Sequence, residues 1–212
     1  MITVNTVLLV LIVGASFYAW NNQHIMSKWI FNPYTVSTQK QWYRFITSGF
    51  IHRDYMHLGF NAYALYAFGG IVEQVYATTR WGVLAYVCLF VFGVIVSDVP
   101  TFLKHKNNPG YNALGASGGI SAVVFASILL FPKIELGIIF IPFFKLPGFL
   151  FGALYLIYSH FMSKKQLDSI NHDAHLYGAL FGVLFTLLSV KNAFFAYFLY
   201  GPFGILGTSN PF

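Results

Sequence analysis

The strongest constraint on this chain is a series of long stretches that contain no Asp, Glu, Lys or Arg. They cover residues 1–27, 55–72, 81–97, 107–132, 146–163, 174–190 and 192–212. A helix needs about 20 mostly apolar residues to cross the hydrocarbon core of a bilayer. Only 8% of the residues are charged and 57% are hydrophobic, which is far from the average of soluble proteins. The chain is therefore predicted to be an integral membrane protein.

Six of these stretches predict long helices, at about 4–22, 57–77, 81–102, 116–131, 147–161 and 173–190. The segment 191–212 carries several glycines and prolines, which interrupt helices, so we expect an apolar tail that lies at the interface or packs loosely. The first stretch lacks the basic residues that open a signal peptide, and we expect a retained helix. The predicted fold class is an all-α membrane protein, a bundle of six transmembrane helices with a long first loop and a single domain over 1–212.

The charges and the single cysteine exclude other classes. The net charge is +6, but the twelve basic residues are scattered between apolar spans, without the continuous patch that would follow nucleic-acid phosphates. We therefore expect no nucleic-acid partner and a lipid bilayer instead. Cys88 is the only cysteine, so a disulfide or a cysteine metal cluster within one chain is excluded.

Polar residues gather beside the connections that face one side of the membrane. Successive spanning helices alternate in direction, so the first, third and fifth connections lie together. Ser117 opens the fourth predicted helix, His175 opens the sixth, and His57 with Asn61 open the second. Three separate segments thus bring a hydroxyl, an imidazole and two further polar side chains to one depth on one side.

These residue types suit peptide hydrolysis by a serine. Ser117 is the candidate nucleophile, and His175 is the base that accepts its proton and returns it to the leaving amine. His57 and Asn61 are four residues apart and share one helical face. With the backbone N–H of Ser117 they are candidate donors to the oxyanion. Each residue alone also has a packing or capping interpretation; the arrangement of all four on one side favours catalysis.

Small residues would let the helices approach. Gly115 and Gly119 form a small-xxx-small pair next to Ser117, and Gly178 with Gly182 lie on the face of His175. We expect these last two glycines to pack against Ser117 and Ser121 and to hold the hydroxyl and the imidazole within hydrogen-bonding distance.

Two other interpretations of the motifs are weaker. "GASGG" fits the nucleophile elbow of soluble hydrolases, with Asp168 or Asp173 as the acid, but that motif needs a parallel sheet. A zinc site from His52, His57, His172 and His175 lacks the glutamate of the zincin pattern. Asp173 is two residues from His175 and would face away on a helix, so we expect it to help cap the sixth helix. A Ser-His dyad without an acidic third member follows.

Four separated segments resemble the rhomboid family of intramembrane serine proteases. "WYRFITSGFIHRDYMHLGFN" is similar to the family's W-R loop followed by H-x-x-x-N. "GGIVE" is similar to its G-x-x-x-E, "GASG" to its nucleophile motif, and "AHLYGALFG" to its A-H-x-x-G-x-x-x-G. These matches span residues 42–182 in the family's order.

The resemblance implies a six-helix bundle with Ser117 as nucleophile, His175 as base, and His57, Asn61 and the Ser117 amide as oxyanion donors. It also implies supporting roles for Trp42 and Arg44 in a first loop partly within the membrane, for Glu73, and for Gly115, Gly118, Gly178 and Gly182. The substrates it implies are transmembrane segments of other proteins, and it implies neither metal nor cofactor. The family also suggests a bacterial cytoplasmic membrane, with the active site facing away from the cytoplasm.

Two features depart from that pattern. Some family members carry a tyrosine one turn after the nucleophile, beneath the histidine, where this chain has Ser121. Support for His175 is then expected from Tyr177 or Phe125. The connections on the catalytic side also hold eight of the twelve Lys and Arg residues, against the positive-inside rule; the orientation above follows the family.

Two rival functions differ in class from a protease. A non-proteolytic rhomboid-like protein would bind or escort transmembrane helices without cutting them, although retention of Ser117 and His175 argues against it. A proton-coupled transporter would need acidic residues in the middle of helices, whereas Glu73 and Asp98 are expected near helix ends. The sequence leaves the oligomeric state and the natural substrate open.

Overall fold

The computed structural model of this chain describes residues 2–138, 141–165 and 171–191. The predicted tail and Asp168 lie outside these residues. The six predicted helices are all present, and none of their ends differs from the prediction by more than four residues. They are α1 (Val4–Trp20), α5 (Tyr55–Ala77), α6 (Val83–His105), α7 (Ser117–Leu130), α8 (Gly148–Lys165) and α9 (His172–Ser189).

Short helices fill the long first connection. They are α2 (Gln23–Trp29), α3 (Pro33–Gln39), α4 (Arg44–Thr47) and the 3-10 turn η1 (Ser48–Phe50). Asn22 and Asn32 cap α2 and α3, because the side chain of each accepts a hydrogen bond from a backbone N–H in the first turn. Pro33 follows Asn32 at the first helical position, where its missing N–H costs nothing. This connection is therefore a folded part of the molecule.

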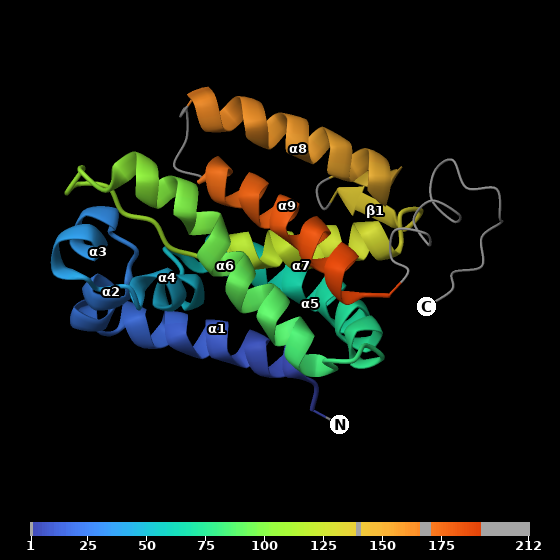
Figure 1. The fold of residues 1–212 in the computed structure, drawn as a ribbon, viewed down its shortest axis with the longest axis horizontal. Helices are drawn as coiled ribbons and strands as arrows, with labels where there is room; N and C mark the ends of the chain where they lie inside the picture. Colours follow the sequence, from blue (N-terminus) through green and yellow to red (C-terminus); the bar gives the residue numbers. More distant parts are fainter. Residues whose placement is uncertain (1, 139–140, 166–170, 192–212) are drawn as a thin grey trace.

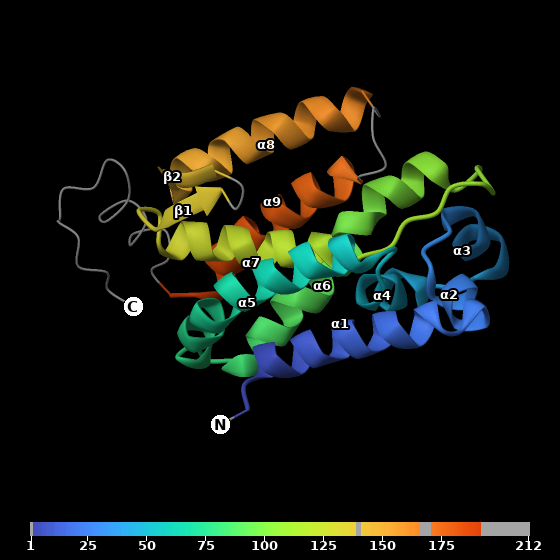
Figure 2. The same ribbon diagram turned by 180° about the vertical axis from the view of Figure 1, so that it is seen from behind.

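A β-hairpin joins α7 to α8, which the sequence did not predict. Strand β1 (Glu135–Ile138) pairs antiparallel with β2 (Ile141–Pro147), with an irregularity between Gly137 and Ile138. Figure 2 shows the hairpin against the start of α8. The other elements in the described residues are helices, so the predicted all-α class is corrected by the addition of this hairpin.

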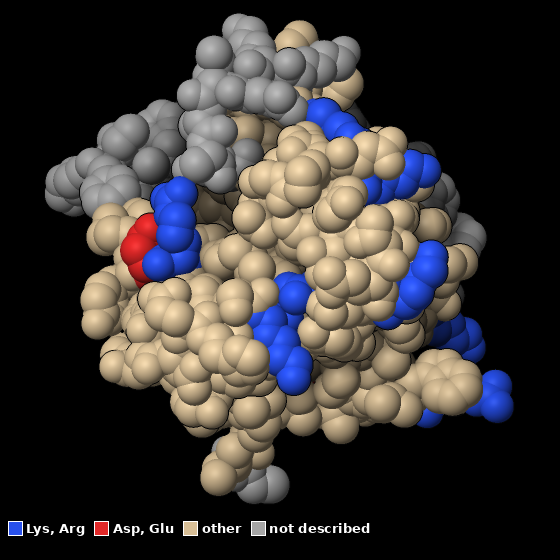
Figure 3. All heavy atoms as spheres, turned by 90° about the vertical axis from the view of Figure 1, so that its left-hand side faces the viewer, with Lys and Arg blue, Asp and Glu red and all other residues tan. Residues whose placement is uncertain are grey.

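The helices run alternately up and down the bundle, as Figures 1 and 2 show. Helices α5, α7 and α9 all begin at the end of the molecule where α2, α3 and α4 lie. That end faces the viewer in Figure 3, which shows Lys and Arg in separate places and few Asp or Glu among them. The basic side chains on this face thus form no continuous patch.

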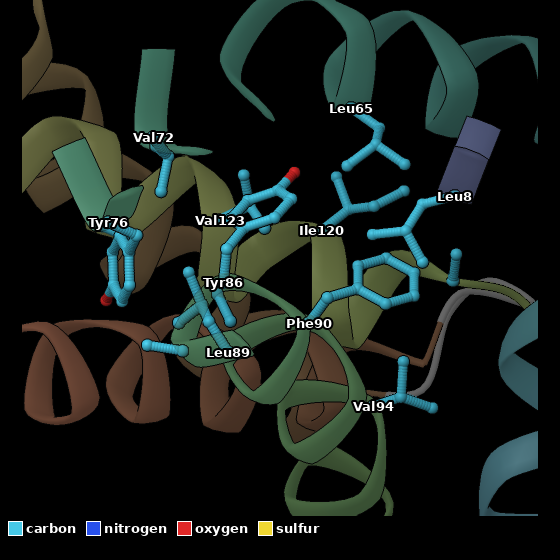
Figure 4. Close-up of a cluster of buried hydrophobic side chains, with 14 of the residues drawn as sticks. Leu8, Leu65, Val72, Tyr76, Tyr86, Leu89, Phe90, Val94, Ile120 and Val123 are labelled. Carbon is cyan, nitrogen blue, oxygen red and sulfur yellow. The ribbon is translucent and has the colours of Figure 1, made fainter. Parts of the chain in front are cut away.

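The core lies where α1, α5, α6 and α7 meet (Figure 4). Leu65 of α5, Phe90 of α6 and Val123 of α7 are fully buried there. Tyr86 of α6 donates a hydrogen bond from its hydroxyl to Oδ1 of Asn5 at 2.7 Å, so the polar groups inside this cluster are paired. This core holds α7, which begins at Ser117, against two neighbouring helices.

Within the described residues, α6 is the one helix that is both long and apolar enough to cross a membrane by length and composition. Helices α1 and α7 and the segment Gly148–Ser163 are apolar but shorter. Because α6 continues to His105, Asp98 lies two turns inside it and not near its end, which corrects the expectation. Asp98 is buried beside a small cavity of about 20 Å³ that Ser117 and Asn171 also line.

Candidate active site

Helix α5 presents His57 and Asn61 one turn apart. Asp54 caps this helix, since its carboxylate accepts a hydrogen bond from the backbone N–H of His57 at 2.8 Å. This bond, with the adjacent Arg53, lowers the pKa of Asp54. The amide nitrogen of Asn61 donates to the carbonyl of His57 at 2.9 Å, which uses one of its two N–H groups. The capping role therefore belongs to Asp54 and leaves the His57 side chain available.

Four hydrogen bonds with the first connection hold the segment before Ser117. Phe31 and Ala113 exchange two backbone hydrogen bonds of 2.9 Å. The N–H of Gly115 donates to the carbonyl of Ser48 at 2.9 Å, and the N–H of Ala116 donates to Nε2 of His52 at 3.3 Å. The long first loop thus fixes the backbone that leads into Ser117.

His52 links this segment to α1. Its Nε2 accepts from Ala116, so Nδ1 carries the proton and donates to Oγ of Ser16 at 2.9 Å. The hydroxyl of Ser16 in turn donates to the carbonyl of Ile12 at 2.7 Å. Burial, with a smaller effect of the neighbouring His57, lowers the pKa of His52 to about 3. His52 therefore has a structural role in holding the segment before Ser117. From the sequence it was considered only as a possible metal ligand.

We expect His52 to make the folded protein sensitive to acid. The unfolded chain binds a proton at His52 near pH 6.5, whereas the folded protein resists it down to about pH 3. Stability from neutral His52 is thus complete above pH 6.5 and falls with the pH, by about 2 kcal/mol at pH 5. His52→Gln keeps one acceptor and one donor without titrating. Denaturant unfolding in detergent at pH 7.5 and pH 5 should show a smaller acid loss for this variant; equal losses would contradict the prediction.

Ser117 is the first residue of α7. Just before it, the backbone at Gly115 passes close to the side chain of His57. Gly115 has φ +121°, a conformation that favours glycine. A Cβ at Gly115 would lie 2.6 Å from Cε1 of His57, so glycine is also needed there for space. Helix α7 begins without a side-chain cap, and the first N–H groups of a helix have no acceptor within it. The first turn of α7, which begins at Ser117, therefore offers backbone N–H donors.

Helix α9 brings in His175 near its start. Asn171 is the cap: its Oδ1 accepts from the N–H of Ala174 at 3.1 Å, and its Nδ2 donates to Oγ1 of Thr101 at 3.0 Å. Asp173 instead pairs with Lys104, with 3.4 Å between Oδ2 and Nζ. The predicted capping role of Asp173 is wrong, because the side chain of Asn171, two residues earlier, accepts the hydrogen bond from the first turn of α9. Both contacts tie the start of α9 to the end of α6.

Glycines bring α7 and α9 into backbone contact, but against other residues than predicted. A Cβ on Gly178 would collide with the carbonyl oxygen of Gly118, and one on Gly182 with that of Ala122. The predicted contacts with Ser117 and Ser121 are therefore wrong by one residue. A one-residue step turns a helix by about 100°, so this difference turns both serines away from the contact and toward a cavity.

One cavity of about 1140 Å³ is lined by all four predicted polar residues, Ser117, His175, His57 and Asn61. Helices α5, α7, α8 and α9 and strand β1 form its walls. Asn61 is buried, and the other three are half-buried. Apolar side chains dominate the rest of the lining, among them Phe60, Phe68, Ile120, Val124 and Phe151.

An aromatic ring from α8 lies beside His175. The rings of Tyr155 and His175 lie with centroids 6.3 Å apart and planes 15° apart. The two residues expected in this role lie elsewhere: Tyr177 is 42% exposed, and Phe125 packs its ring on Tyr155, with centroids 5.7 Å apart. Sequence reasoning missed Tyr155 because it is distant in the chain from both Ser117 and His175.

Arg44 and Glu73 each stabilise another part of the structure, the first loop and the start of α1. Nη1 of Arg44 donates to the carbonyls of Ser27 and Ile30 at 2.8 and 2.6 Å, which closes the first loop. Trp42 stacks on Phe45 beside it, with ring centroids 6.2 Å apart. The Glu73 carboxylate accepts hydrogen bonds from the N–H groups of Val4 and Asn5, both at 2.8 Å, and so satisfies the start of α1; Glu73 does not line the cavity.

The four histidines of the zinc interpretation do not form a metal site. Both ring nitrogens of His52 are engaged, with Ser16 and with Ala116. In the part of the chain that the structure describes, no group of three His, Cys, Asp or Glu side chains is arranged to hold a metal ion.

These features define a helical membrane protein with a serine, two histidines and an asparagine in one internal cavity. Residues 39–192 match the family model described as Rhomboid domain. This match covers most of the chain, and the protein belongs to the rhomboid family. The resemblance seen in its sequence is thereby confirmed.

Several curated relatives are similar in sequence. Rhomboid-like protein 11, chloroplastic, of Arabidopsis thaliana is 29% identical over 71% of this chain and 53% of its own length. Presenilin-associated rhomboid-like protein, mitochondrial, is 32% identical in Mus musculus and 31% in Homo sapiens, over 65% of this chain and 36% and 35% of theirs. The chain thus spans about half or less of their length. Their organellar names give no support to the expected bacterial membrane.

Proposed function

We propose that this protein is an intramembrane serine endopeptidase that cuts transmembrane segments of other proteins. The observation that carries the proposal is the shared cavity of Ser117, His175, His57 and Asn61. These residues come from three helices, and a structural role for each alone would not require them to line one cavity. Membership of the rhomboid family supports the same reaction.

In this reaction the Ser117 hydroxyl attacks the carbonyl carbon of the scissile peptide while His175 accepts its proton. The resulting oxyanion receives hydrogen bonds from the Ser117 N–H, the second N–H of Asn61 and the His57 ring. His175 then gives the proton to the leaving amine, and an acyl ester forms on Ser117. Water, activated by His175, hydrolyses this ester and restores the hydroxyl.

The mostly apolar lining of the cavity suits a hydrophobic polypeptide. When the helix of a substrate unwinds, its backbone N–H and C=O groups lose their hydrogen-bond partners, and lipid offers none. The polar end of the cavity, where α5, α7 and α9 begin, offers partners for such groups. We therefore propose that the long helices span the bilayer and that the scissile bond enters at this end.

Labelling with a fluorophosphonate tests the proposal directly. The purified protein in detergent should form a covalent adduct on Ser117, located by mass spectrometry, and should cut a model transmembrane substrate in liposomes. Binding of the substrate without adduct or cleavage would instead identify a non-proteolytic rhomboid-like protein that holds transmembrane helices.

We expect Asn61→Ala to lower kcat by about 10²- to 10³-fold, the usual cost of one oxyanion donor, with KM changed by less than about threefold. Steady-state cleavage of the model substrate measures both constants. Asn108→Ala, in the exposed turn after α6, is the matched control and should keep wild-type kcat. A rise in KM at constant kcat would mean that Asn61 binds substrate and does not stabilise the oxyanion.

A further inference from the structure

The aromatic residues of α8 pair with the histidines of α9 in an antiparallel register. Tyr155 lies parallel to His175, with centroids 6.3 Å apart. One turn further along α8, the Tyr158 ring meets His172 edge to face, with centroids 5.5 Å apart. Parallel and edge-to-face rings at these separations attract each other. The orientation of α9 at His175 is thus linked to α8 through side chains.

Tyr155 is itself held from several directions. Its hydroxyl lies 3.4 Å from Oγ of Ser121, one turn after Ser117 on α7. Its ring also contacts Phe125 of α7 and Phe151 of α8, with centroids 5.7 and 6.1 Å apart. A ring restrained in this way can in turn restrain the imidazole beside it. All of these residues line the cavity of Ser117 and His175.

We propose that Tyr155 is the positioning residue for His175, and that the dyad is therefore aligned only while α8 is docked against α7 and α9. The inference rests on the proposed function, since it assigns the support of the base in that same site. Leu154, Ile157 and Phe161 on the outer face of α8 are half or more exposed. The position of α8 therefore depends largely on its inner face, which carries Tyr155.

Substitutions at Tyr155 distinguish a role in positioning His175 from a role in lining the cavity. We expect Tyr155→Leu to lower kcat by about 10- to 100-fold, because displacement of a catalytic group by about 1 Å can cost this much, with KM changed by less than about threefold. Fluorophosphonate labelling of Ser117 should slow to a similar degree. Tyr155→Phe keeps the ring and should stay within about threefold of wild type. Phe161→Leu, on the exposed face of α8, is the control and should keep wild-type kcat.

A second variant tests the dependence on α8. A Cβ at Gly152 would already lie 3.3 Å from Phe125, so Gly152→Leu should push α8 from α7 without replacing a residue of the cavity. We expect kcat to fall as in Tyr155→Leu. The double variant should lose little more than either single variant, because both act through one ring. Circular dichroism and thermal unfolding verify that each variant is folded.

The outcomes distinguish the inference from the function on which it rests. A wild-type protein that is neither labelled nor active would overturn the proposed function. An active wild type with unchanged kcat in folded Tyr155→Leu would overturn only the positioning role. An increased KM at constant kcat would likewise overturn it, since Tyr155 would then contact substrate. Loss of kcat in Tyr155→Phe equal to that in Tyr155→Leu would assign the effect to the hydroxyl and contradict the role of the ring.

Discussion

Replacing Ser117 with alanine is expected to abolish both cleavage and fluorophosphonate labelling, with a loss of at least about 10³-fold in kcat. Loss of the nucleophile removes covalent catalysis, and the hydroxyl of Ser121, one turn further along α7, lies beside that of Tyr155. The change deletes one oxygen from a half-buried side chain at the edge of a cavity. We therefore expect the thermal unfolding temperature to stay close to that of the wild type.

The matched control for Ser117→Ala is Ser127→Ala on the same helix. Ser127 is buried, its hydroxyl donates to the carbonyl of Val124 at 2.8 Å, and Ser127 itself does not line the cavity. This variant should keep activity within a few-fold of wild type. Labelling and cleavage that persist at wild-type rates in folded Ser117→Ala would refute the protease proposal, together with every role assigned around Ser117.

The second large effect is expected from a single methyl group at Gly178. A Cβ at this position collides with the carbonyl oxygen of Gly118 and lies 2.9 and 3.0 Å from its backbone carbons. Backbone atoms cannot rotate away as a side chain can, so α7 and α9 must separate. We expect Gly178→Ala to destabilise the protein by about 1 to 3 kcal/mol, as overpacking usually does, and to lower kcat by about 10²-fold.

Gly14→Ala in α1 is the control for this substitution. A Cβ at Gly14 meets nothing within 4 Å, and alanine is the better helix former. The variant should be as stable as the wild type or slightly more stable, with unchanged kcat. Thermal unfolding in detergent and substrate cleavage measure the two effects. Wild-type stability and kcat in Gly178→Ala would show that the contact between α7 and α9 is not needed to align the dyad.

The contact between α7 and α9 also shows what the spacing of small residues in a helix can and cannot predict. The glycines at 178 and 182 indicated close packing correctly, because a small side chain removes the barrier to a second backbone. The partner register did not follow, since spacing along one helix says nothing about the rotation of another. The core of Figure 4 sets that rotation, through side chains of α1, α5 and α6 that bury against α7.

The first connection gives a similar lesson. The sequence predicted a long first loop, and Arg44 was named from a motif. The bonds of Phe31, Ser48 and His52 to the segment 113–116 had no counterpart in the sequence. Except for the imidazole of His52, backbone groups both donate and accept in these bonds. Backbone groups can do so whatever the residue type, so the pattern of side chains does not predict these bonds.

The sequence by itself determined the six long helices, their alternating direction and the polar residues at one end, because hydropathy and helix length are local properties. Tertiary structure alone decided which atoms meet: Ala116 with His52, Gly118 with Gly178, and Tyr155 with His175. Each of these contacts joins residues at least 20 positions apart, and their geometry depends on how all the helices pack together.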